Sequence, residues 1–321
     1  AGASYQQILA SGGGIHNTVA RTRVASEEEL TKDCQGRLNR MLCSGTTTVE
    51  AKSGYGLSLA DEAKILRVAG RLDGIGPWDV IPTLLGAHAL PGEYSENRDG
   101  YVELVEEMIE TLADRAVFVD AFCEIGAFTS RECRRLFEKG CAAGLGIKLH
   151  ADQLSDSGGA TLAAELGANS ADHLDFVSVD GMAAMAKAGV IGVMLPTVPL
   201  YVGSRRQAPA ARLQAAGVPL ALATDFNPGT SPVDSMGIVV ALACLQMRMS
   251  PAAALVAATR NAAYAVGRGS RIGTLEVGKQ ADLQIYAVDD YAELPYKFGM
   301  QQPSVVIKAG RVVVEDGTVV G

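Results

Sequence analysis

Four side chains that could bind a metal ion stand at equivalent places in the chain, each at or just past the end of a short apolar run. Imidazole and carboxylate groups together suit Zn²⁺ or Fe²⁺. A catalytic metal of this kind keeps one position open for a water molecule and lowers the pKa of that water towards about 7. The pattern therefore predicts metal-assisted hydrolysis. The four residues are His88, His150, His173 and Asp225.

A serine hydrolase is the competing chemistry for histidine and aspartate. Its nucleophile would stand in a Gly-x-Ser-x-Gly turn after a strand, and no such turn occurs in the sequence. A lone histidine is usually structural, but three of the four histidines at equivalent positions point to a site. The fourth, His16, follows a run of three glycines and has no assigned role.

The segments that carry these residues alternate between two patterns. Short runs rich in β-branched residues predict strands, and longer amphipathic stretches between them predict helices. Ser26 followed by Glu29 predicts a capping box at one helix start. The predicted strands are 46–50, 80–85, 117–123, 146–150, 170–173, 190–195 and 219–224, and the predicted helices are 26–43, 60–72, 101–113, 130–143, 157–166, 179–187 and 208–216.

Repeated strand and helix units predict a parallel α/β fold, either an open doubly wound sheet or a (β/α)8 barrel with one strand missing. In a parallel barrel all strand C-termini open on one face, where the four candidate ligands would meet. No Gly-x-Gly-x-x-Gly follows an early strand, so a dinucleotide site is disfavoured. We interpret Gly12–Gly14 as a turn.

The pattern changes after Thr224. Helices are predicted at 235–247 and 251–266, followed by strands near 281–288, 304–309 and 311–315, with a hairpin at Gly310. So few strands cannot bury both faces alone, and we expect them to need partner strands.

Composition excludes several classes of partner. The formal net charge of −8 argues against nucleic acid and anionic membranes as partners. No apolar run is long enough to cross a bilayer. The six cysteines are scattered without a Cys-x-x-Cys pair, which favours reduced thiols in a cytosolic protein.

Several segments resemble the amidohydrolase superfamily. Residues 146–153, Gly-Ile-Lys-Leu-His-Ala-Asp-Gln, resemble its fifth-strand metal site, and Ala-Asp-His173 resembles its sixth-strand histidine. Residues 223–230, Ala-Thr-Asp-Phe-Asn-Pro-Gly-Thr, resemble its eighth-strand aspartate and following loop, and 273–283 resembles the return to its small β domain. Segments 12–16, 52–57, 86–88 and 225–230 are most similar to the imidazolonepropionase family.

The resemblance implies a TIM-type barrel over residues 1–270, incomplete at its N-terminus, and part of a small β-sandwich domain over 271–321. It implies hydrolysis of 4-imidazolone-5-propanoate to N-formimidoyl-L-glutamate in histidine degradation, with one divalent metal, Zn²⁺ or Fe²⁺, or else Fe³⁺. It also implies a cytoplasmic homodimer.

The resemblance further implies residue roles. His150 and Asp225 would bind the metal, and Asp225 would also accept the proton of the attacking water. His173 would polarise the reacting carbonyl or move a proton, and Gln153 would join these catalytic residues. The residues that would contact the substrate are Tyr55, His88, Gln153, Asn227, Gly229 and Thr230. The last two would do so through backbone groups at a helix start.

Structural roles are open for some of these residues. Tyr55 could be a turn aromatic, Gln153 could cap the next helix, and Asn227 before a proline favours a turn by itself. Lys52 ends a predicted strand, and we interpret it as a structural residue or one that supports the site.

One expected motif is absent. The superfamily places a His-x-His pair at the end of its first barrel strand, and no such pair occurs here. An arginine that the family uses for the substrate carboxylate also has no match. We therefore expect residue 1 to lie inside the first βα unit of a longer protein, and this chain to retain metal poorly and show little activity. The alternatives are a cytosine or guanine deaminase-like enzyme, or a non-catalytic barrel.

Overall fold

The larger sheet has seven parallel strands in chain order, and it forms an open barrel. The structure is a computed structural model that describes residues 14–298 and 300–320. Each strand pairs in parallel with the next one along the chain, and β1 and β7 form the two edges. The strands are Thr48–Lys52 (β1), Asp79–Ala87 (β2), Phe118–Cys123 (β3), Gly146–Ala151 (β4), Ser170–His173 (β5), Ile191–Met194 (β6) and Leu220–Leu222 (β7).

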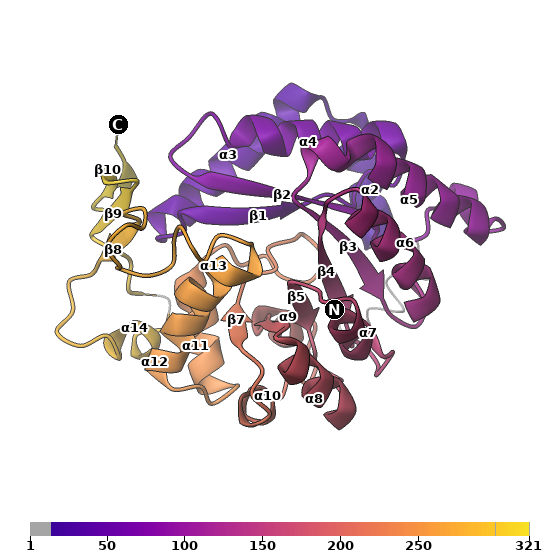
Figure 1. The fold of residues 1–321 in the computed structure, drawn as a ribbon. Helices are drawn as coiled ribbons and strands as arrows, with labels where there is room; N and C mark the ends of the chain where they lie inside the picture. Colours follow the sequence, from indigo (N-terminus) through magenta and orange to yellow (C-terminus); the bar gives the residue numbers. More distant parts are fainter. Residues whose placement is uncertain (1–13, 299, 321) are drawn as a thin grey trace.

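Helices that precede the first strand or connect successive strands cover the outside of this sheet (Figure 1). The predicted capping box is present, because the Ser26 hydroxyl accepts from the Glu29 backbone and the Glu29 side chain accepts from the Ser26 backbone. These helices are α3 (Glu27–Cys43), α4 (Leu59–Leu72), α5 (Arg98–Leu112), α6 (Ser130–Ala142), α7 (Gly159–Glu165), α8 (Val179–Ala188) and α10 (Ala210–Ala215). The predicted (β/α) barrel with seven of its strands is thus confirmed.

Other helices were predicted only in part. The predicted helix 251–266 is α12 (Pro251–Val256), a π-helical turn η3 (Ala257–Asn261) and α13 (Ala262–Ala265), and α11 is Met236–Leu245. The expected glycine turn lies outside the described residues except for Gly14, which caps α2. Periodicity missed α2 (Ile15–Val24), α9 (Thr197–Tyr201), α14 (Glu293–Tyr296) and the single turns η1 (Gly92–Tyr94) and η2 (Ala113–Arg115).

The last four strands form a separate antiparallel sheet in the order β11, β10, β9, β8. Val306 and Val314 lie on its buried face and pack with Leu38 and Leu42 of α3. Helices α3 and α4 cover this face, whereas Ile285 and Val312 of the same sheet are 50% and 47% exposed, so the expectation of partner strands stays a prediction. The strands are β8 (Leu283–Ile285), β9 (Val305–Lys308), β10 (Arg311–Glu315) and β11 (Thr318–Val319).

Within residues 14–298 and 300–320, no helix combines the length and apolar character that a bilayer crossing requires.

Candidate active site

The three strand-end histidines come together at the C-terminal face of the barrel. His88 follows β2 directly, His150 is the penultimate residue of β4, and His173 is the last residue of β5. The ring centroids of His88 and His150 are 6.1 Å apart, and those of His150 and His173 are 5.3 Å apart. Asp225 follows the end of β7 and lies close enough to His150 for that ring to lower its pKa.

Tyr55 and His88 form one side of this group. The two rings meet edge to face with centroids 5.2 Å apart. The His88 Nδ1 atom lies 3.0 Å from the Gly54 carbonyl oxygen. Burial, followed by the neighbouring His150, lowers the pKa of His88 to about 4, so the ring is neutral at neutral pH. Tyr55 therefore lies against His88, and contact of Tyr55 with the substrate stays a prediction.

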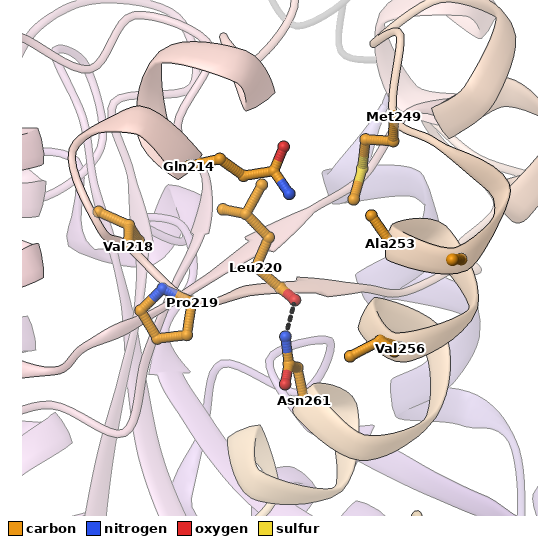
Figure 2. Close-up of a pocket in the computed structure, with 9 residues that line it drawn as sticks. Gln214, Val218, Pro219, Leu220, Met249, Ala253, Val256 and Asn261 are labelled. Carbon is orange, nitrogen blue, oxygen red and sulfur yellow. Dashed lines mark hydrogen bonds between the residues drawn. The ribbon is translucent and has the colours of Figure 1, made fainter.

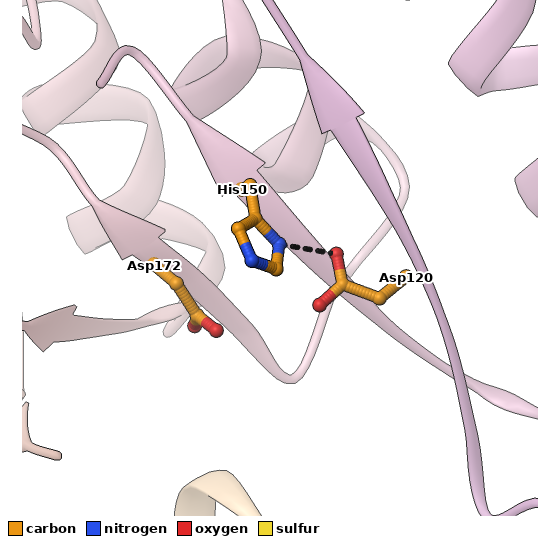
Figure 3. Close-up of side chains that lie close together, drawn as sticks. All are labelled: Asp120, His150 and Asp172. Carbon is orange, nitrogen blue, oxygen red and sulfur yellow. Dashed lines mark hydrogen bonds and ion pairs between the residues drawn. The ribbon is translucent and has the colours of Figure 1, made fainter. Parts of the chain in front are cut away.

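The His150 ring is hydrogen-bonded by Asp120, a residue that the sequence did not identify as part of the site. The His150 Nδ1 atom lies 3.0 Å from Asp120 Oδ1, and the Asp120 side chain is fully buried (Figure 3). A carboxylate accepts hydrogen bonds only, so this contact places a proton on Nδ1. Burial acts against the charged ring, but the Asp120 carboxylate outweighs it and raises the pKa of His150. When the ring is neutral, Nε2 carries the free electron pair. A histidine oriented in this way by a carboxylate is the usual arrangement for a metal ligand.

Lys52 lies at the centre of a buried charge network that continues from Asp120. Its Nζ atom is 2.6 Å from Asp120 Oδ2, 3.2 Å from Asp172 Oδ2 and 3.0 Å from Glu50 Oε1. Lys148 Nζ is 3.2 Å from Glu50 Oε2. The supporting role expected for Lys52 agrees with these contacts.

A period-two signal in the sequence could have found this network. Glu50 and Lys52 are two residues apart on β1, and Lys148 and His150 are two residues apart on β4. Residues two apart on a strand share one face, so these charged pairs point to the same side of the sheet. Charged residues at alternate positions of otherwise apolar strands mark a polar interior.

Asp120, His150 and Asp172 place one ligand atom each within 4.8 Å of one another (Figure 3). The Lys52 ammonium group already contacts both carboxylates. Because the Lys52 ammonium group pairs with both carboxylates, a cation of the protein itself already occupies the position that a metal ion would take between them. We therefore take the free Nε2 of His150, on the other side of the ring, as the group that faces the reaction site.

His173 is buried and carries an unusual backbone. Its φ is 77° and that of Leu174 is 67°, which are strained values for residues other than glycine. Its Nδ1 atom is buried without a hydrogen-bond partner among the described residues. Burial, followed by His150, lowers the pKa of His173 to about 3. A strained, neutral and unpartnered imidazole is typical of a functional position.

The pKa of Asp225 is raised, whereas the pKa values of His88 and His173 are lowered. Burial raises the pKa of its carboxyl group to about 6, although His150 and Lys52 act to lower it. Its φ of 49° is again unusual for this residue type. Asn227 Nδ2 donates to Asp225 Oδ2 over 3.1 Å. A buried carboxyl group that titrates near neutral pH suits a proton acceptor.

The loop after Asp225 is held by Asn227, as its turn propensity suggested. Asn227 Oδ1 accepts from the Gly229 N–H at 2.9 Å and from the Thr230 N–H at 2.8 Å. The expectation that this loop opens a helix is wrong, because α11 begins only at Met236. The helix start therefore offers no reason for substrate contact at Gly229 or Thr230.

Gln153 is not the cap of the following helix. Asp152 fills that role, because its carboxylate accepts from the backbone N–H groups of Ser157, Gly159 and Ala160 at 3.0 to 3.1 Å. Gln153 is half-buried in the bend that follows β4. It follows His150 by three residues in the sequence, and its contact with the substrate stays a prediction.

A cavity of about 330 Å³ lies at the opposite end of the barrel (Figure 2). It is lined by Leu220 at the start of β7 and by Met249 and Val256, and Asn261 Nδ2 donates to the Leu220 carbonyl oxygen over 2.7 Å. None of the candidate site residues lines it. The cavity is therefore separate from the chemistry.

Known proteins match the chain over most of its length. The Amidohydrolase family profile matches residues 3–314. Imidazolonepropionase of Geobacillus thermodenitrificans is 52% identical, in an alignment that covers 99% of this chain and 76% of the relative. Imidazolonepropionase of Geobacillus kaustophilus is 51% identical with the same coverage.

Solved structures share the architecture at low sequence identity. An adenosine deaminase from Xanthomonas campestris with bound zinc has a TM-score of 0.74 at 21% identity, covering 99% of this chain and 76% of that one. N-isopropylammelide isopropylaminohydrolase from Burkholderia multivorans has a TM-score of 0.70 at 19% identity, covering 89% and 75%. At these identities the likeness shows the amidohydrolase fold.

Proposed function

Because the chain belongs to the imidazolonepropionase family of amidohydrolases, we propose that its site hydrolyses 4-imidazolone-5-propanoate to N-formimidoyl-L-glutamate. The observation that carries the proposal is the meeting of His88, His150 and His173 with Asp225 at one face of the barrel. In this reaction the oxygen of water bonds to the ring carbonyl carbon and the adjacent ring C–N bond breaks. The released nitrogen takes one proton.

The donor set fits a divalent metal such as Zn²⁺ or Fe²⁺. His150 offers a free Nε2, since Asp120 engages Nδ1. Asp225 is a buried carboxyl group whose pKa is raised by burial. These two residues would hold the ion. When bound, the metal supplies a water molecule whose pKa is lowered towards about 7.

The other residues move protons and orient the substrate. Asp225 accepts a proton from the attacking water and passes it to the leaving ring nitrogen, which a carboxyl pKa of about 6 permits in both directions. His173 stays neutral and hydrogen-bonds the reacting carbonyl oxygen. We propose that Gln153, half-buried in the bend after β4, contacts the imidazolone ring and holds it in place.

Substrate recognition involves two loops. Tyr55 and His88 contact one edge of the imidazolone ring, with the Nε2 atom of His88 as the acceptor for a ring N–H. The loop from Asn227 to Thr230 lies beside Asp225, and its internal hydrogen bonds make it rigid. We propose that Asn227, Gly229 and Thr230 contact the other side of the substrate.

A substrate panel tests this function. The chain, supplied with excess Zn²⁺, should consume 4-imidazolone-5-propanoate and leave cytosine and guanine unchanged. His150→Ala should lose this turnover, while Glu29→Gln at the surface start of α3 should keep it. Deamination of either base, or full turnover by the His150 variant, would overturn the proposal.

A further inference from the structure

The loop that carries Tyr55 is built around one buried carboxylate, that of Glu62 in the first turn of α4. Its Oε2 atom accepts from the Gly54 N–H, and its Oε1 atom accepts from the N–H groups of Gly56 and Leu57, each at 2.8 Å. The Glu62 side chain is fully buried. A buried carboxylate is costly unless it is hydrogen-bonded, and three backbone donors satisfy this one.

Arg23 of α2 also hydrogen-bonds to this loop. The Arg23 Nε atom donates to the Gly56 carbonyl oxygen over 2.7 Å. Three N–H groups of the segment from Gly54 to Leu57, and the Gly56 carbonyl group, thus have charged partners in two different helices. The backbone of the loop cannot shift without breaking charge-assisted hydrogen bonds.

Gly54 links the hydrogen bonds of Glu62 to the His88 ring in the site. Its N–H is bound by Glu62, and its carbonyl oxygen lies 3.0 Å from His88 Nδ1. A carbonyl oxygen only accepts, so Nδ1 of His88 must carry the proton and Nε2 must be the acceptor. Gly54 has a φ of 93°, and a Cβ there would lie 2.7 Å from the Leu85 carbonyl oxygen, so the glycine permits this approach.

We propose that Glu62 is a positioning residue, which holds the loop from Gly54 to Leu57 and thereby sets the tautomer of His88 for substrate recognition. The recognition part rests on the proposed function, whereas the tautomer part does not. Glu62 does not touch the substrate. Through Gly54 it acts on the His88 ring, which contacts the substrate.

The Glu62→Gln variant should act selectively. A glutamine amide has one acceptor and one donor end, and three backbone donors face it. The oxygen best satisfies the pair at Gly56 and Leu57, which leaves the amide NH₂ group facing the Gly54 N–H. The Gly54 peptide then turns away, and the hydrogen bond that fixes His88 is lost.

Nitrogen-15 NMR of the full chain with labelled histidine measures this directly. The four histidines give few signals, and the spectrum of His88→Gln identifies that of His88. In the unsubstituted chain His88 should be protonated at Nδ1, and in Glu62→Gln it should show mixed tautomers. Glu29→Gln, which loses the same charge at the surface, should match the unsubstituted chain.

A titration with N-formimidoyl-L-glutamate, the proposed product, supplies the second readout. Glu62→Gln should weaken its binding on the order of ten-fold, because one buried hydrogen bond is lost. An Nε2–H tautomer of His88 in the unsubstituted chain overturns the inference even if the variant fails to fold. The inference is also overturned if a folded Glu62→Gln variant shows the same His88 tautomer and the same product affinity as the unsubstituted chain. No binding to the unsubstituted chain contradicts the proposed function instead, and leaves the tautomer measurement to decide the role of Glu62.

Discussion

Lys52→Met should destabilise the fold strongly, because it removes the cation that three buried carboxylates share. The Nζ atom of Lys52 lies between 2.6 and 3.2 Å from oxygens of Glu50, Asp120 and Asp172. The Asp120 side chain is 0% exposed and that of Lys52 is 21% exposed. Removal of one partner of a buried ion pair costs about 3 to 5 kcal/mol. Residual exposure of Lys52 places the loss near the lower end, about 3 kcal/mol.

Thermal and urea unfolding, followed by circular dichroism, measure this loss. A loss of about 3 kcal/mol corresponds to a decrease in Tm of roughly 4 to 5 °C, because the unfolding entropy grows with chain length at about 2.1 cal/mol/K per residue. Lys139→Met is the matched control. It breaks a solvent-exposed pair with Glu110, 2.7 Å long, and should cost much less stability than Lys52→Met.

The double variant Lys52→Met with Asp120→Asn separates the ion pair from other effects. Removal of both charges leaves less uncompensated charge than removal of Lys52 alone, so the double loss should be smaller than the sum by about 1 kcal/mol or more. If the two losses add, or if Lys52→Met costs no more than Lys139→Met, the network does not stabilise the barrel as reasoned.

Burial raises the pKa of Asp175 to about 7, above the unfolded value of 3.8. The contribution of Asp175 to the free energy of unfolding is therefore fully present below about pH 4 and is lost as the pH rises through 7. Asp175→Asn should therefore flatten the decline in Tm between pH 5 and 8 and be the more stable form at pH 8; equal slopes would contradict this. Leu42→Ala, at a fully buried position between α3 and the C-terminal sheet, should cost about 2 to 5 kcal/mol in urea unfolding. With only His150 and Asp225 as proposed ligands, Zn²⁺ should be lost on dialysis and measured below one equivalent by elemental analysis. The homodimer implied by the family should appear as twice the chain mass in sedimentation.

Much of the barrel could be predicted because its strands are short apolar runs bounded by helices with clear caps. The predicted strand 170–173 matches β5, and the predicted strand 146–150 differs from β4 by one residue. The convergence of His88, His150 and His173 followed from the rule that parallel strands end on one face.

The support around the site was harder to predict. Asp120 and Asp172 lie on different strands from Lys52, and only the sheet register brings the three together. The positive φ angles of His173 and Asp225 are uncommon for residues other than glycine, and no sequence pattern predicts them. Glu62 looked like an ordinary residue in the first turn of a helix, because its three partners belong to a loop.

The most direct measurement is hydrolysis of 4-imidazolone-5-propanoate by the chain and by Asp225→Asn, each with increasing Zn²⁺. We expect slow turnover that rises with the metal concentration and falls at least a hundred-fold in the variant, because the neutral amide can accept no proton. Equal turnover in the two proteins, or turnover independent of the metal, would contradict a metal-assisted reaction at this face of the barrel.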